Sequence, residues 1–137
     1  MVYKLQAEIV KEPQRWKFQY DDRQERTYFG NGEVAVKIFD DECYLDISMF
    51  ASGDFKQYFS NDGYYPEIQP TSYRFKAPGF TAIAFKNRFD ERVWINERYY
   101  RIFRKYRLED NNAGLVLVRN PSTLELVAVI ATVKVQG

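Results

Sequence analysis

The stretch LVLVRNPSTLELVAVIATVKV, residues 115–135, decides the fold class of this chain. Two apolar runs, 115–118 and 124–135, flank the turn sequence Asn-Pro-Ser-Thr at 120–123. Proline in such a turn presets φ, and the asparagine before it can bond forward to the turn backbone. Apolar β-forming runs on either side of a turn predict an antiparallel hairpin. We therefore expect a mostly β protein that ends in a hairpin.

The last strand of this hairpin is apolar on both faces. One face carries Leu124, Leu126 and Ile130, and the other carries Val127, Val129, Val133 and Val135. A strand that is apolar on both faces must be covered on both faces. The cover can come from the rest of the fold, which makes this a central strand, or from a neighbouring subunit. In the second case Val127, Val129 and Val133 would form a buried contact between subunits.

The chain before this hairpin also has mainly strand character. Tyr28 to Val34 reads as a hairpin, because Asn and Gly at its centre tolerate the positive φ of a tight turn. Charged turns are expected at 21–23 and 40–42. Alternating apolar residues predict further strands at 2–10, 15–20, 44–50, 72–77 and 80–86, and we place Cys43 in this apolar pattern as a small core residue.

One short helix is expected between Ser52 and Phe59, because Phe55, Tyr58 and Phe59 have helical spacing and Ser52 or Asp54 could cap it. No internal repeat, low-complexity tract or linker interrupts the sequence. We therefore predict one domain over residues 1–137, an antiparallel β-sandwich or barrel with one short helix.

Residues 92–108 fit two structures. As a hairpin, residues 93–95 pair with 99–103 around Asn96 and Glu97, and the density of aromatic residues favours this reading. As a helix, the stripe at i, i+3, i+4 and i+7 consists of Tyr99, Ile102, Phe103 and Tyr106. Periodicity leaves both open for residues 97–108, and we expect the hairpin.

Several classes of site are excluded by residues that the chain lacks. It has no histidine, which excludes Ser-His-Asp and Cys-His catalysis and the usual zinc sites. Cys43 is the only cysteine, so no disulfide forms within the chain. The segment Gly30-Asn31-Gly32 lacks the frame of a phosphate-binding loop. The carboxylates at 40–42 and 46 are expected to be a solvated turn. We expect no catalytic residues, no metal, no cofactor and no enzymatic activity.

The N-terminus has no apolar core of a signal peptide, and the longest apolar stretch, 126–133, is too short for a membrane span. We expect intracellular folding and no membrane partner. The net charge is +1, but residues 1–69 carry 8 basic and 13 acidic side chains, whereas residues 70–137 carry 12 and 6. A charge division of this kind suits contacts between copies or one basic face, unless folding mixes the two halves.

A basic and aromatic run is the strongest candidate for a binding surface. It interleaves Arg98, Arg101, Arg104, Lys105 and Arg107 with Tyr99, Tyr100, Phe103 and Tyr106, and Arg88 and Arg92 could extend it. Such a run fits a solvated basic face over a buried aromatic face, an acidic protein surface, or single-stranded nucleic acid. The residues expected to contact a partner are Tyr99, Tyr100, Arg101, Phe103 and Arg104.

The run from Arg92 to Ile102, followed by Asp110 to Val118, resembles the strand-turn-strand-loop-strand segment at the ends of small tailed-phage head–tail joining and neck proteins. The resemblance covers residues 92–118. It implies a non-enzymatic subunit of a symmetric ring whose strand edges are completed between copies, in a virion assembled in the host cytoplasm. Abundant aromatic residues, 18% of the chain, suit such repeated interfaces.

Two functions follow as expectations. The first is a homo-oligomeric structural protein of the neck, tail or baseplate, which binds itself and other assembly subunits. The alternative is a small cytoplasmic protein that binds single-stranded nucleic acid through an OB-like barrel.

Overall fold

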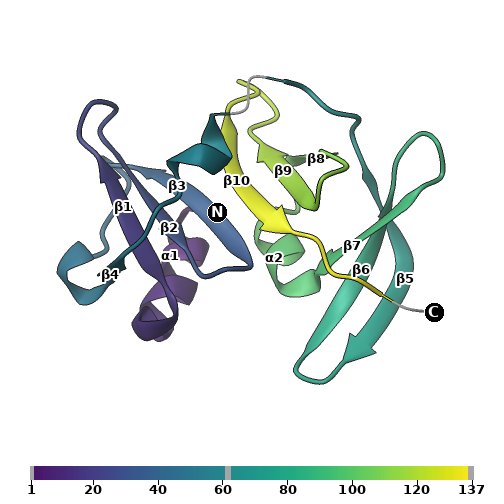
Figure 1. The fold of residues 1–137 in the computed structure, drawn as a ribbon, viewed down its shortest axis with the longest axis horizontal. Helices are drawn as coiled ribbons and strands as arrows, with labels where there is room; N and C mark the ends of the chain where they lie inside the picture. The colour runs from purple at the N-terminus through teal and green to yellow at the C-terminus, as the bar shows by residue number, and fades with distance from the viewer. Residues whose placement is uncertain (1, 61–62, 136–137) are drawn as a thin grey trace. The chain divides into compact units, whose positions relative to one another are not determined.

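A computed structural model describes residues 2–60 and 63–135, and the chain divides into two compact units, Met1–Asn61 and Asp62–Gly137 (Figure 1). Strands are the main secondary structure of the described residues taken together, so the mostly β class is confirmed. The described residues contain two α-helices, α1 and α2, rather than the one short helix that we expected. The prediction that residues 1–137 form one domain stays a prediction.

Unit 1 is built on a meander of three antiparallel strands, β1 (Lys17–Asp21), β2 (Arg26–Gly30) and β3 (Val34–Phe39). A two-residue strand, β4 (Ala51–Ser52), pairs parallel with β1. The hairpin predicted at 28–34 is confirmed. Its turn is held by the Asn31 side chain, whose Oδ1 accepts hydrogen bonds from the amides of residues 33 and 34.

The strand predicted at 2–10 is wrong, because these residues form helix α1 (Val2–Lys11). Its buried residues are Leu5, Gln6 and Ile9, which lie on one side of a helix. The Gln6 side chain is fully buried and fixes the helix: Nε2 donates to the Glu42 carbonyl and Oε1 accepts from the Tyr44 amide. A short 3-10 helix, η1 (Pro13–Arg15), leads from α1 to β1.

The strand predicted at 44–50 is also wrong. A 3-10 helix, η2 (Ile47–Met49), interrupts the segment, and the Asp46 carboxylate caps it by accepting from the Ser48 amide. The expected helix near 52–59 exists as a 3-10 turn, η3 (Lys56–Phe59). Its first amides donate to Oε1 of Gln19, so the cap comes from β1 and not from Ser52 or Asp54. Cys43 is half-buried outside any strand.

Unit 2 has two groups of three antiparallel strands. One contains β5 (Gln69–Ala77), β6 (Phe80–Lys86) and β7 (Arg92–Asn96), and the other contains β8 (Arg107–Asp110), β9 (Leu115–Arg119) and β10 (Leu126–Ala131). The strands predicted at 72–77 and 80–86 are therefore confirmed. Two backbone hydrogen bonds link these two groups of strands. The Ile68 amide, just before β5, donates to Leu108 O of β8 at 3.0 Å, and the Val133 amide, after β10, donates to Trp94 O of β7 at 2.7 Å.

The C-terminal hairpin is confirmed. Strands β9 and β10 pair antiparallel, with Leu117 opposite Val129. The Asn120 carboxamide accepts from the amides of residues 122 and 123, which is the forward bonding that the Asn-Pro sequence predicts. The last strand thus pairs along β9 within its own chain, and most of its side chains are buried.

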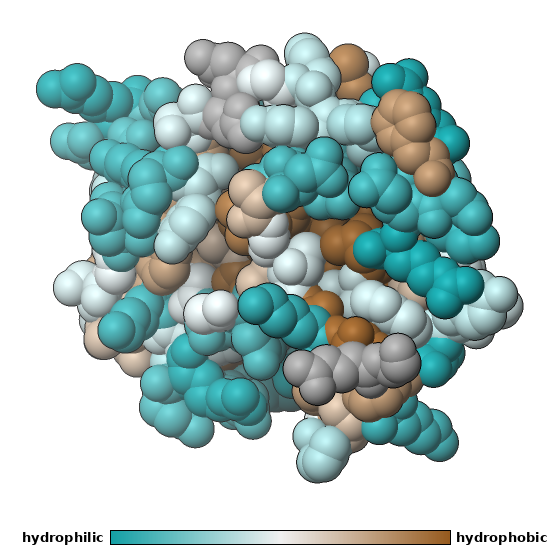
Figure 2. Space-filling view, turned by 45° about the vertical axis from the view of Figure 1, so that its right-hand side comes forward, coloured by the Kyte–Doolittle hydropathy of each residue, from teal (hydrophilic) through white to brown (hydrophobic). Residues whose placement is uncertain are grey.

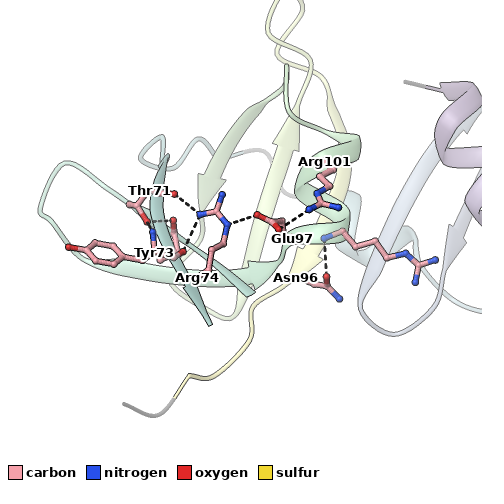
Figure 3. Close-up of polar contacts among 8 residues, drawn as sticks. Thr71, Tyr73, Arg74, Asn96, Glu97 and Arg101 are labelled. Atoms are coloured by element: carbon pink, nitrogen blue, oxygen red, sulfur yellow. Dashed lines mark hydrogen bonds and ion pairs between the residues drawn. The ribbon is translucent and has the colours of Figure 1, made fainter. Parts of the chain in front are cut away.

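The hairpin predicted around Asn96 and Glu97 is wrong, and the helical alternative is right for residues 97–102. Strand β7 ends at Asn96, and helix α2 (Glu97–Ile102) starts there because Asn96 Oδ1 accepts from the Arg98 amide (Figure 3). Tyr99 and Phe103 face the core, as the helical spacing required. The chain returns to strand only at β8.

Candidate functional site

The residues predicted to bind a partner divide into buried and exposed groups. Tyr99, Phe103 and Val129 are buried in the described chain, where they contribute to the core of unit 2. Val127 and Val133 are half-buried. Three of the eight predicted residues lie at or near the surface of α2 and the turn after it, namely Tyr100, Arg101 and Arg104.

Near α2, aromatic and ionic contacts fix these three side chains. Tyr100 packs edge-on against Phe85 of β6, with ring centroids 5.0 Å apart. The Arg104 guanidinium lies 5.7 Å from the centre of the Tyr100 ring. Arg101 donates to Glu97 at 3.1 Å, one helical turn earlier, and its side chain is still 67% exposed. The basic and aromatic run is therefore not one continuous surface, since its aromatic residues mainly fill the core.

Glu97 also receives a second arginine, from β5. Figure 3 shows Arg74 reaching from β5 to Glu97, while Arg101 approaches the same carboxylate from α2. The Arg74 guanidinium in addition donates to the carbonyls of Thr71 and Tyr73, beside the irregularity where the β5–β6 register shifts. This cluster fixes α2 to the edge of the sheet, so we assign it a structural role.

A second group of side chains lies on the sheet of β5, β6 and β7, and we call it the β5–β7 cluster: Tyr73, Phe75, Lys86 and Arg92. The Arg92 guanidinium lies 4.1 Å from the centre of the Tyr73 ring, and Lys86 Nζ lies 5.9 Å from it. Tyr73 is 47% exposed and Phe75 is 40% exposed. Figure 3 shows the Tyr73 ring directed away from Arg74 and Glu97.

Arg92 was expected to extend the basic run, but the other members of the β5–β7 cluster were not predicted. The signal was present at residues 73–76, Tyr-Arg-Phe-Lys, where aromatic and basic residues alternate. In a strand, this alternation places the two aromatic rings on one side and the two cations on the other. Figure 2 shows that hydrophilic residues cover most of the visible face of the molecule, with smaller apolar areas between them.

The most deeply buried charges form a third cluster around Glu109 of β8. Its carboxylate accepts from Arg119 Nε at 2.9 Å, from Arg107 Nε at 2.7 Å and from the Tyr65 amide at 3.2 Å. Arg119 also donates to the carbonyls of Leu124 and Gly63. Arg107 and Glu109 lie on the same strand, but the other contacts each join two segments of unit 2, which makes the cluster a structural one.

Hydrogen bonds decide the protonation state of Glu109. Burial by itself would raise the pKa of this carboxyl, but the hydrogen bonds from Arg107, Arg119 and the Tyr65 amide outweigh burial and hold the pKa below its ordinary value. Glu109 is therefore ionised and paired at neutral pH. A buried carboxylate in this state is a poor proton donor or acceptor.

The acidic turn at 40–42 is exposed, as expected, and two carboxylates in or near it have hydrogen-bond partners. Asp40 accepts from the Tyr20 hydroxyl at 2.7 Å, and Asp46 caps η2. Within residues 2–60 and 63–135, no three Cys, Asp or Glu side chains are grouped so that they could hold a metal ion. The helices in that part of the chain are all too short or too polar to cross a membrane.

Three surfaces thus remain as candidates for contact: the exposed part of α2, the edge of β5, and the β5–β7 cluster. Comparison of the chain with protein families, curated proteins and solved structures gives no significant match.

Proposed function

We propose that this protein is a non-enzymatic assembly subunit, which binds copies of itself and other subunits through a strand edge and exposed aromatic side chains. We further propose that it belongs to the neck, tail or baseplate of a tailed phage. The assignment to a phage particle is based on the resemblance of residues 92–118 to head–tail joining and neck proteins. The proposed mode of contact between subunits is based on the exposed edge of strand β5.

Strand β5 supports the mode of contact because it is the outer strand of its sheet, paired with β6 on one side. It is nine residues long, and residues 72–76 are all exposed. In the described residues, no second strand pairs with residues 74–77. An exposed strand edge of this length is a template for a strand of another chain, and proteins without such a partner usually shorten or cover it.

Exposed aromatic residues support the same conclusion. Tyr73 and Phe75 are two residues apart on β5, so their side chains point to the same face of the sheet. Both can therefore contact the same face of an added strand. Tyrosine and phenylalanine are enriched in interfaces because each covers a large area at little cost in conformational entropy. Tyr100, Arg101 and Arg104 on α2, together with Val127 and Val133, remain the further proposed contact residues.

Mass photometry of the full chain over a range of concentrations tests this proposal. The wild type should form oligomers, and Phe75→Asp should shift the distribution toward monomers, because a charge on an exposed strand opposes edge pairing. Tyr3→Asp is the matched control: Tyr3 is 74% exposed on α1, far from β5 in sequence, so its replacement should leave the distribution unchanged. A wild type that stays monomeric at all concentrations would contradict self-assembly.

A separate experiment tests whether the protein is a component of a phage particle. Phage particles purified from the organism that encodes the chain should contain it, as measured by mass spectrometry of washed particles. Its absence from particles would contradict the virion assignment while leaving the oligomer measurement intact.

A further inference from the structure

We infer that unit 2 binds single-stranded nucleic acid at the β5–β7 cluster, with bases stacked on Tyr73 and Phe75 and phosphates held by Lys86 and Arg92. This inference goes beyond the proposed assembly function and does not depend on it. Assembly would use the outer backbone edge of β5 together with the rings of Tyr73 and Phe75. Nucleic acid would use the same two rings together with the cations of Lys86 and Arg92 on one face of the sheet.

Strand register places the cluster on a single face. Lys86 is directly opposite Arg92, and Phe75 is directly opposite Ala82, and directly opposed residues share a face. Ala82 and Lys86 are four residues apart on β6, so the cluster spans about 13 Å at the usual rise per residue. Between them on this face of β6 lies only Ala84, opposite the half-buried Trp94. No long side chain of β6 therefore separates the aromatic rings from the cations.

The contacts of Tyr73 bring together the two kinds of group that bind a single strand, cations for its phosphates and an aromatic ring for its bases. The cations of Arg92 and Lys86 lie over its ring, so positive charge and an aromatic surface are presented together. Exposed rings stack on bases of any sequence, and a basic groove follows the phosphate backbone. Arginine in addition matches the geometry of phosphate oxygens through its planar guanidinium.

Competing carboxylates do not neutralise this face. Lys86 pairs with Asp90 at 3.0 Å, but the Asp90 side chain is 80% exposed, so the pair is weak and a phosphate can replace it. No carboxylate in residues 2–60 and 63–135 forms an ion pair with Arg92. By contrast, Arg74 is held by Glu97 on the other side of β5. Arg92 is therefore the cation of the cluster that is most available to a phosphate.

An acidic protein surface would be attracted by the same cations, but it would not require the aromatic rings. Stacking on a base depends on the ring of Tyr73, whereas attraction to carboxylates depends on Lys86 and Arg92 alone. The contribution of the ring therefore distinguishes nucleic acid from an acidic protein, and the experiment measures it directly.

Fluorescence anisotropy with a labelled oligothymidine of about 15 nucleotides tests the inference, since single-strand sites in small barrels cover about 4–16 nucleotides. The wild type should bind at low salt, and the logarithm of the affinity should fall linearly with the logarithm of the salt concentration. Tyr73→Ser should weaken binding about 5- to 150-fold through the loss of one stacked base. Arg92→Gln should lower the salt slope by about 0.7, the value for one single-strand phosphate contact.

Two control variants in unit 1 remove the same kinds of exposed group, one aromatic ring and one cation. Tyr3→Ser removes an exposed ring, and Lys11→Gln removes an exposed cation, so both should bind like the wild type. Circular dichroism melting of each variant verifies that it is folded. If Arg92→Gln proves unstable, the comparison of Tyr73→Ser with Tyr3→Ser carries the test alone.

Three outcomes would overturn the inference. The first is the absence of binding at about 50 mM salt, where phosphate contacts are strong. The second is equal affinity for duplex and single strand with no effect of Tyr73→Ser, which would indicate unspecific charge attraction. The third is displacement of the oligonucleotide by polyglutamate at equal charge concentration, which would assign the cluster to an acidic protein. A parallel series with oligouridine distinguishes RNA from DNA as the preferred strand.

Discussion

Replacing Glu109 by glutamine should destabilise unit 2 by about 3–5 kcal/mol, the usual result of removing one partner from a buried ion pair. Glu109 has no exposed side-chain surface, and the Arg119 side chain is only 5% exposed. The glutamine keeps the shape and one acceptor oxygen, but its amide group would oppose the guanidinium of Arg119 or Arg107. The main cost is the positive charge of Arg119, which would remain buried without a carboxylate.

Two further variants test whether the pair itself is responsible. Arg107→Met should cost about 1 kcal/mol or less, because the Arg107 side chain is 32% exposed and water can solvate part of its charge. The double replacement of Glu109 and Arg119 by Leu and Met should be less harmful than the sum of the single replacements, with a coupling energy of about 0.5–3 kcal/mol. Apolar residues of similar size leave no unpaired charge behind.

Urea unfolding measures these values, and the two tryptophans separate the units. Trp16 lies in unit 1 and Trp94 in unit 2, so a Trp16→Phe background reports on unit 2 alone. The midpoint should fall while the slope of free energy against urea stays constant. A loss below about 1 kcal/mol with an unchanged slope would refute the reasoning, because it would mean that the buried charge is solvated or relaxed at little cost.

Acid should remove the contribution of Glu109. Its pKa is lowered in the folded chain, so the folded state favours the ionised form and gains stability above the unfolded-state pKa of about 4.3. This stability is lost as pH falls through the lowered folded pKa. The difference in stability between the wild type and Glu109→Gln should therefore shrink below about pH 4. A difference that stays constant down to about pH 2 would contradict the lowered pKa.

Replacements at three other positions have expected outcomes in the same unfolding assay. Gln6→Leu should cost about 1–3 kcal/mol, because the Tyr44 amide loses its acceptor; no loss would mean that water replaces it. Gly30→Ala should cost about 1–3 kcal/mol, because the new Cβ would overlap the Phe55 ring. A neutral result would show that the ring moves freely. Asn96→Ala should cost about 1 kcal/mol through the lost cap of α2, and Asn96→Asp should restore most of it.

The hairpins were predictable because their turns are local. Asn31 and Asn120 each hold a turn through bonds to amides two and three residues later, so the sequence carries the whole interaction. Gly32 adopts φ of +91°, which glycine allows at no steric cost. The apolar runs on either side of these turns then predict strands.

The helices were harder to predict, because in a short segment the same apolar residues fit both the helical period and the strand period. The spacing of Val2, Leu5 and Ile9 fits a helix at i, i+3 and i+7 better than an alternation, but few residues separate the two readings. At 97–102 the aromatic residues favoured a strand, while the Asn96 cap and the burial of Tyr99 decided for a helix. Tertiary packing overrides intrinsic preference in such segments.

The sequence by itself determined the β class, the turns and the absence of histidine chemistry, since these depend on composition and on residues a few positions apart. Only the tertiary structure placed Arg119 on Glu109 and Arg92 on Tyr73, so that one arginine became structural and another was presented at the surface. The physical reason is that such contacts depend on strand register, which the packing of the whole sheet selects. Arg92 meets Tyr73 across β6 because β7 and β5 pair with opposite sides of that strand.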